Sequence, residues 1–276
     1  MRVAQLSDLH LLEPGFSARS FGSQWRARFL SIGRPLDAKA RRTRFVDALK
    51  AAVQRGFDHL LVSGDLTEEG EPEQFEVAAE ALAEAKIASD RVTLLAGNHD
   101  IYARSDGWKR ALAGPLAAAA QASRFGEPID TRGVTFIPVD TTRAQHYVLS
   151  AGELDHAQWD KVRALVADRT KKGRAVVLFM HHPPRRHVFS PMQWIDGLRN
   201  AHLVHTLLKD FPNVHVIHGH THRAVQEIWP GNARARVFSS ESVVESKDPL
   251  RVYNVDDSGV SIAALPARRV PAFATA

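Results

Sequence analysis

The sequence predicts an α/β fold in which β-strands and helices alternate along the chain. Short apolar runs that end at turn residues have the length of buried strands, and the segments between them have the spacing of amphipathic helices. The end of the chain differs, because four strand-like runs follow one another there without helices. Such alternation is typical of layered α/β proteins.

Strands are expected along most of the chain at residues 2–6, 58–62, 91–95, 134–139, 175–180 and 214–217. Helices are expected between them at residues 39–54, 72–86, 105–121, 153–170 and 198–210, and Pro72 and Ser105 are plausible helix starts. An antiparallel segment is expected to complete the sheet with strands at residues 225–229, 234–239, 250–255 and 260–265. We expect one domain over residues 1–267 and a loose tail over 268–276.

Length and composition are those of an ordinary globular protein. The 276 residues can bury a large core, and 44% hydrophobic with 24% charged residues is an average balance. No apolar run reaches the roughly 18 residues of a membrane-spanning helix, and we expect no signal peptide before the first strand. The absence of cysteine excludes disulfides and thiolate metal sites and fits a cytoplasmic protein. A net charge of +5 suits a phosphate-bearing substrate.

Five short motifs each follow an expected strand. They are Asp8-Leu9-His10, Gly64-Asp65, Gly97-Asn98-His99-Asp100, His181-His182-Pro183 and Gly219-His220-Thr221-His222. Ligands of α/β sheets gather outside the carboxyl ends of the strands, so these side chains are expected to lie together. Carboxylate, amide and imidazole ligands suit Mn, Fe, Zn or Co. One such motif is weak evidence, whereas five in one order predict a metal site.

These motifs resemble the calcineurin-like metallophosphoesterase superfamily, whose pattern is D-x-H, G-D, G-N-H-D/E, a His before a Pro-containing turn, and G-H-x-H. The resemblance covers residues 8–222 and implies a four-layer α-β-β-α sandwich, with two mixed sheets flanked by helices. It implies two di- or trivalent metal ions, such as Mn, Fe or Zn. The implied ligands are Asp8, His10, Asp65 and His222 for the first metal, and the bridging Asp65 with Asn98, His181 and His220 for the second.

Three further residues have implied roles at this site. The family pattern His-x-Pro favours His181 over its neighbour His182, which stays an alternative ligand. His99 is expected to face the phosphoester as a general acid or electrostatic helper. Asp100 either anchors the loop or orients His99, and the alternative is that it only caps the turn.

The implied chemistry is phosphoester hydrolysis. Two metals can lower the pKa of a bridging water and clamp the phosphoryl oxygens, so we expect a hydroxide to attack phosphorus in line. The chain keeps every ligand of the family pattern, which argues against a non-catalytic scaffold. Its motifs differ from those of protein Ser/Thr phosphatases around Gly-Asp and Gly-Asn-His.

The segment 184–198 bears on the substrate. Within it we expect Arg185, His187, Trp194 and Asp196 to contact the substrate. The stretch 194–200 is similar to the cyclic-nucleotide and glycerophosphodiester phosphodiesterase branch, which favours a small phosphodiester. The alternative is an ordinary surface loop in which Trp194 fills the core.

The segment 13–44 is rich in basic and apolar residues. The basic residues are Arg19, Arg26, Arg28, Arg34, Lys39, Arg41, Arg42 and Arg44, and the apolar ones include Phe16, Phe21, Trp25, Phe29, Leu30 and Ile32. Such an insertion can lie on an anionic membrane surface, which makes a membrane-peripheral hydrolase of a lipid or lipid-nucleotide phosphoester the second hypothesis. Alternatively, Trp25, Phe29 and Ile32 pack the segment down while the arginines are solvated. Nucleic acid is not expected, because no recognition motif is present. The resemblance also allows a homo-oligomer paired near the last helices.

Overall fold

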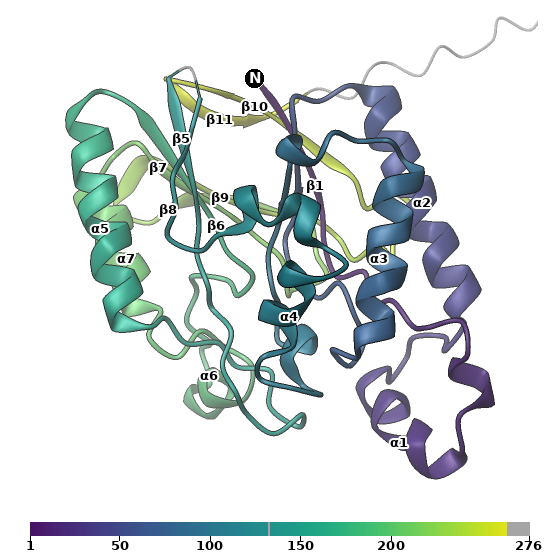
Figure 1. Ribbon diagram of the computed structural model, residues 1–276. Helices are drawn as coiled ribbons and strands as arrows, with labels where there is room; N and C mark the ends of the chain where they lie inside the picture. Colours follow the sequence, from purple (N-terminus) through teal and green to yellow (C-terminus); the bar gives the residue numbers. More distant parts are fainter. Residues whose placement is uncertain (132, 264–276) are drawn as a thin grey trace, which may run out of the picture.

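A computed structural model describes residues 1–131 and 133–263 and confirms the four-layer sandwich (Figure 1). Helices α2 (Ala38–Arg55) and α3 (Pro72–Glu84) cover the outer face of one sheet. Helices α5 (His156–Lys171) and α7 (His202–Asp210) cover the outer face of the other. The expected tail at 268–276 lies outside the described residues. Among the described helices, none combines the length and apolar character needed to cross a bilayer.

The first sheet has the strand order β11-β10-β1-β2-β3. Its parallel strands are β1 (Arg2–Leu6), β2 (His59–Val62) and β3 (Val92–Leu94). The antiparallel strands β10 (Arg251–Asp256) and β11 (Gly259–Ile262) extend it beyond β1. The three parallel strands therefore end at one edge.

The second sheet has the strand order β4-β5-β6-β7-β9-β8. Its strands are β4 (Ile129–Asp130), β5 (Val134–Pro138), β6 (Ala175–Phe179), β7 (Val214–His218), β9 (Asn232–Ser239) and β8 (Val225–Trp229). The expectation that the closing strands form one antiparallel segment was wrong. β8 and β9 join the second sheet, with β9 parallel to β7, whereas β10 and β11 join the first.

Alternate residues of the central strands build three buried layers. Leu60 and Val62 of β2 pack toward α2 and α3, and Leu61 packs between the sheets. In β6, Val177 faces the same intersheet layer, and Val176 packs toward α5 and α7. Strands buried on both faces read as continuous apolar runs, which is why the sequence located them well.

Two helices differ from their predicted bounds. The helix expected at 105–121 is only α4 (Gly107–Ala113), followed by 3-10 turns at Ala117–Ala119 and Gln121–Ser123. Gly114 and Pro115 interrupt it, because glycine weakens a helix and proline lacks the amide hydrogen. The helix expected from residue 198 begins at His202, since Leu198 forms a β-bridge with Gly152.

Two short helices near the metal motifs were not predicted. α1 (Phe21–Leu30) lies within the 13–44 segment, after a 3-10 turn at Phe16–Ala18, and α6 (Ser190–Ile195) lies within the 184–198 segment. Trp194 on α6 is 62% exposed, so the alternative in which it fills the core was wrong. Trp25 on α1 is 49% exposed, and it is instead Leu12, Phe16 and Ala27 that pack the segment down.

Candidate dinuclear metal centre

The predicted ligands gather where parallel strands of both sheets end. Asp8, Asp65 and Asn98 follow β1, β2 and β3, and His181 and His220 follow β6 and β7. The first two loops are joined by backbone hydrogen bonds, from Asp8 N to Gly64 O at 3.1 Å and from His10 N to Asp65 O at 2.9 Å. The fold therefore brings together residues that lie more than 200 positions apart.

The backbone at these ligands is strained. Five predicted ligands have a positive φ, between 45° and 68°: Asp8, His10, Asp65, His220 and His222. For residues with a side chain this conformation costs about 1 kcal/mol or more each. Among the other described non-glycine residues, only Lys86 has a positive φ. Strain concentrated on the ligand set indicates that their geometry serves a function rather than the fold.

Asp8, His10 and His222 have the spacing of ligands around one ion. His222 Nε2 lies 3.3 Å from His10 Nε2 and 3.4 Å from Asp8 Oδ1. Ligand atoms about 2.0–2.1 Å from a tetrahedral metal lie about 3.3–3.4 Å from one another. Asp8 Oδ2 is buried without a hydrogen-bond partner among the described residues. These donor atoms therefore fit the predicted first metal.

A second set has the same spacing. His181 Nε2 lies 3.4 Å from Asp65 Oδ2 and 3.3 Å from Asn98 Oδ1. Asp65 belongs to a group of converging donor atoms with His10 and His99 and to another with Asp8 and His181. It thus stands between the two sets, as a bridging carboxylate must.

The close approach of the ligand side chains to neighbouring loops requires glycine at two positions. A Cβ atom at Gly64 would lie 2.2 Å from His181 Nδ1, and one at Gly97 would lie 2.1 Å from Asp65 Oδ1. Any larger residue at either position would displace a ligand. The glycines of the G-D and G-N-H-D motifs therefore make room for the ligands of neighbouring loops.

The hydrogen bonds of the adjacent histidines favour His181 as the ligand. His181 Nδ1 bonds to Ser63 O at 2.8 Å, which leaves Nε2 directed at Asp65 and Asn98. The His182 ring also lies near this cluster. Both of its nitrogens, however, are used at 2.8 Å, by Thr141 Oγ1 and by Ser150 O.

His220 is held through its outer nitrogen. Its Nε2 lies 2.9 Å from Asp196 O and 3.0 Å from Asp196 Oδ1, which leaves Nδ1 as the nitrogen available to a metal. Burial opposes the charge on Asp196, but the hydrogen bond and charge of His220, together with Ser150 and His182, lower the pKa of the carboxyl below its usual range. Asp196, predicted to contact substrate, thus holds the ring of a predicted ligand in place, as carboxylates beside metal-binding histidines commonly do.

His99 and Asp100 occupy different environments. His99 Nδ1 lies 2.7 Å from Glu68 O, and its backbone N–H donates to Asp65 Oδ1 at 2.9 Å. The Asp100 carboxylate accepts from Leu66 N, Thr67 N, Thr67 Oγ1 and Gly97 N. Burial, with the nearby Asp65 charge, raises the pKa of Asp100 to about 7. Its recorded contacts join the G-D and G-N-H-D loops, so the geometry favours the loop-anchoring role, and it is Glu68 that orients the His99 ring.

Charges within the cluster compensate one another. Burial disfavours a charged imidazole, but the Asp65 carboxylate outweighs it and raises the pKa of His181 to about 9. Asp8 acts likewise on His222, whose pKa rises to about 10. Such rings hold protons that cations would displace, so metal binding at this cluster is coupled to proton release.

Sequence reasoning missed two carboxylates behind the ligands, Glu68 and Glu245, which lie against the outer sides of His10 and His222. Tyr102, which from its place after the Gly-Asn-His-Asp motif could line the pocket or pack behind it, bonds to the Asn98 amide. Glu68 stands in an acidic stretch with nothing to single it out. Tyr102, four residues after Asn98, could have been assigned from its nearness to the motif, but its contact depends on the loop conformation.

The family model for calcineurin-like phosphoesterases matches residues 1–224. The chain belongs to the calcineurin-like phosphoesterase family. Its donor set fits the two metals of a dimetal phosphoesterase, and it is a hydrolase of phosphoesters.

Similar proteins agree with this family. The chain is 28% identical over 223 residues to the glycerophosphodiester phosphodiesterase GpdQ of Enterobacter lignolyticus (strain SCF1), covering 80% of this chain and 71% of that protein. A dimetal phosphatase from Danio rerio has a similar fold, with a TM-score of 0.66 at 14% identity over 93% of each chain. The protein TT1561 of Thermus thermophilus has a TM-score of 0.53 at 13% identity, covering 95% of this chain and 97% of that one.

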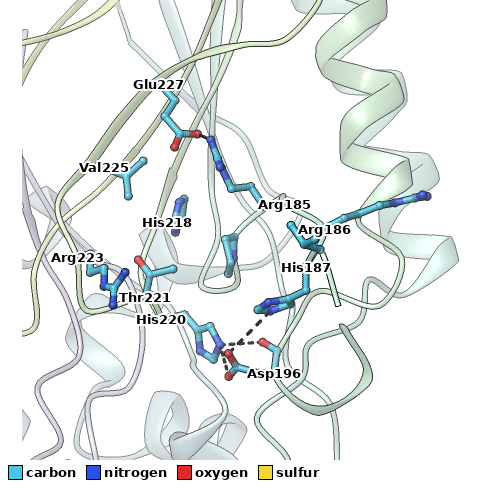
Figure 2. Close-up of a pocket in the computed structure, with 12 residues that line it drawn as sticks. Arg185, Arg186, His187, Asp196, His218, His220, Thr221, Arg223, Val225 and Glu227 are labelled. Carbon is cyan, nitrogen blue, oxygen red and sulfur yellow. Dashed lines mark hydrogen bonds and ion pairs between the residues drawn. The ribbon is translucent and has the colours of Figure 1, made fainter. Parts of the chain in front are cut away.

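A cavity of about 580 Å³ adjoins the metal site of this calcineurin-like phosphoesterase on the side of His220 (Figure 2). Of the residues that the sequence predicted to contact substrate, Arg185, His187 and Asp196 line this cavity and Trp194 is not among its lining residues. Arg185 pairs there with Glu227, and His187 Nε2 lies 3.9 Å from Asp196 Oδ2. The lining therefore carries charges of both signs.

Proposed function

We propose that this protein is a dinuclear metal-dependent phosphodiesterase that hydrolyses a small diester. Asp8, His10, Asp65 and His222 would hold the first metal, and Asp65, Asn98, His181 and His220 the second. Two bound ions supply an acidified water as nucleophile and offset charge on the phosphoryl oxygens.

The cavity beside His220 is the observation that supports a diester substrate. A phosphodiester has two alcohol substituents, and a leaving group directed at His99 leaves the second one to be accommodated elsewhere. The roughly 580 Å³ beside His220 can take a small alcohol group. Because charged side chains of both signs line it, this space suits a polar alcohol. The name of the similar enzyme GpdQ, a glycerophosphodiester phosphodiesterase, supports the same substrate class.

Side chains of this protein prepare the leaving-group step. The contact of His99 Nδ1 with Glu68 O turns Nε2 into the nitrogen that can exchange a proton with the departing alkoxide. The His99 ring packs edge-on against His10, with ring centres 4.5 Å apart, so it stands beside the first ligand set. Asp100 keeps this loop in register with Asp65 through Thr67 and Gly97.

The test compares bis(p-nitrophenyl) phosphate with p-nitrophenyl phosphate. Protein that is stripped of metal and then given Mn²⁺ should hydrolyse the diester faster than the monoester. Before the metal is returned, activity should be absent. Faster turnover of the monoester would overturn the diester assignment. An Arg185→Ala variant should raise KM for glycerophosphodiesters more than for the aryl diester, because only the former place a polar alcohol in the cavity.

A membrane-peripheral hydrolase of lipid phosphoesters is a second candidate, supported by one exposed face. On and just after α1, Phe21 and Ile32 are 77% and 76% exposed, and Trp25 and Phe29 are about half exposed. Such a face suits an interfacial contact. The arginines contribute less than the sequence implied, because Arg19 and Arg26 pair with Glu69 and because Arg34 and Arg41 pair with Glu68.

Co-sedimentation with vesicles separates the two candidates. A lipid-acting enzyme should bind neutral phosphatidylcholine vesicles through α1, and Phe21→Ser with Ile32→Ser should abolish that binding. Ile228→Ser, at a 60% exposed position on β8, is the matched control. Wild-type protein that stays in the supernatant with both neutral and anionic vesicles would contradict the membrane candidate.

A further inference from the structure

The two imidazoles of the first ligand set are each backed by a carboxylate. His10 and His222 direct their Nε2 atoms at each other, 3.3 Å apart. On the opposite side of the rings, His222 Nδ1 lies 3.1 Å from Glu245 Oε2, and His10 Nδ1 lies 3.8 Å from Glu68 Oε2, which is within ion-pair distance but beyond that of a hydrogen bond. A carboxylate bonded to the outer nitrogen of a ligating histidine fixes the orientation of the ring and its tautomer, as Glu245 can for His222, whereas Glu68 acts on His10 through its charge.

Both carboxylates converge on Arg34. Its Nη2 donates to Glu68 Oε1 at 2.9 Å, and its Nη1 lies 3.9 Å from Glu245 Oε1. The Arg34 side chain is 9% exposed, and that of Glu68 is fully buried. A buried carboxylate needs a paired cation, because an unpaired one would be strongly destabilising. One guanidinium thus connects the outer sides of His10 and His222.

Arg41, which like Arg34 belongs to the segment 13–44, fixes the position of Glu68. It donates to Glu68 Oε2 at 2.5 Å and to His10 O at 2.6 Å. It also bonds to Ser31 Oγ and Pro35 O, so all three nitrogens of its nearly buried guanidinium donate a hydrogen bond. The basic residues of segment 13–44 that lie deepest are therefore directed at the metal site and not at solvent.

The second ligand set is supported by other parts of the chain. His181 bonds to Ser63 O, His220 to Asp196, and the Asn98 amide to Tyr102. None of these recorded contacts involves residues 13–44. A change at Arg34 should therefore act on one metal only.

We propose that Arg34 is a positioning residue for the first metal: it holds Glu68 and Glu245 behind His10 and His222, so that both rings keep Nε2 directed at the ion. The inference rests on the proposed function only in that the site binds two metals. It assigns the 13–44 segment a part in metal affinity, whatever ester is hydrolysed.

The experiment is a calorimetric titration of metal-free protein with Zn²⁺, with His222→Ala and Asn98→Ala used to assign the two binding steps. In Arg34→Met, affinity at the first site should fall about 10- to 100-fold, the range for changes behind metal ligands, and the second site should keep its affinity within about twofold. Arg34→Lys keeps the charge but cannot span both carboxylates, so it should restore only part of the loss. Arg42→Met is the matched control, because Arg42 pairs with Glu84 on α3, away from the site.

Unchanged affinity in both steps of Arg34→Met would overturn the proposal. An equal loss of affinity in both binding steps, accompanied by a lower Tm, would also overturn the proposal, since that pattern indicates a general effect on folding. If Arg34→Met does not fold, Glu245→Gln tests the same link at a partly exposed position, and a selective loss at the first site is again expected. Wild-type protein that binds two metals but hydrolyses no diester would overturn the proposed function and leave this inference standing.

Discussion

Asn98 Nδ2 donates a 2.7 Å hydrogen bond to Tyr102 Oη, which in turn donates to Leu149 O at 2.9 Å. This contact decides which end of the Asn98 amide faces the ligand cluster. With the nitrogen held by Tyr102, Oδ1 is turned toward His181 Nε2, 3.3 Å away. An amide can coordinate a metal only through its oxygen, so Tyr102 selects the orientation that binds.

Tyr102→Phe should therefore weaken the second metal. Loss of the hydroxyl frees the amide to rotate and leaves Leu149 O without its donor, so we expect affinity at that site to fall about tenfold or more. Calorimetric titration with Zn²⁺ measures this affinity. Tyr147→Phe, whose ring packs on Trp25 of α1, is the control. Equal affinity in Tyr102→Phe and wild type would contradict this role.

Asp65→Ala should remove both metals, because the carboxylate stands between the two donor sets. We expect less than one metal per chain by elemental analysis after dialysis, together with loss of diester hydrolysis. Asp160→Ala, an exposed position on α5, should bind two metals as the wild type does. Retention of one tightly bound metal in Asp65→Ala would show that the carboxylate serves a single site.

His99→Ala should keep both metals and lose turnover. His99 is not in either donor set proposed here, and a positioned acid or base contributes about 100- to 10,000-fold to a rate. We therefore expect kcat on bis(p-nitrophenyl) phosphate to fall within that range while metal content stays at two. Full turnover in metal-loaded His99→Ala would exclude a role in proton transfer.

Acid should destabilise the fold through two histidines distant from the metals. Burial lowers the pKa of His59 and of His215 from 6.5 to about 4. The unfolded chain binds these protons more readily, so the stability linked to each ring is complete above pH 6.5 and is lost as the pH falls toward 4. Each ring can account for up to about 3 kcal/mol.

Denaturant unfolding between pH 7 and pH 4.5 measures this dependence. The free energy of unfolding should fall with pH, and His59→Gln should make the fall less steep. His156→Gln, at an exposed position where α5 begins, should leave the steepness unchanged. An identical slope in His59→Gln and wild type would mean that other groups dominate the acid response.

The sequence by itself determined the family, the layered fold and the predicted ligand set. It did so because the signals are local. Each predicted ligand lies two to four residues after a strand end, and parallel strands place those ends at one edge of the sheets. Strands buried on both faces, such as β2 and β6, also carry an apolar signal that needs no knowledge of their neighbours.

Only the tertiary structure decided how the side chains around the ligands pair. Asp196, predicted to contact substrate, lines the cavity and also holds His220. Arg34, for which the sequence left a membrane surface and solvent open, lies behind His10 and His222. The closing strands, expected as one segment, divide between the two sheets. These outcomes depend on contacts between residues up to about 200 positions apart, which burial and charge pairing select only once the layers have packed.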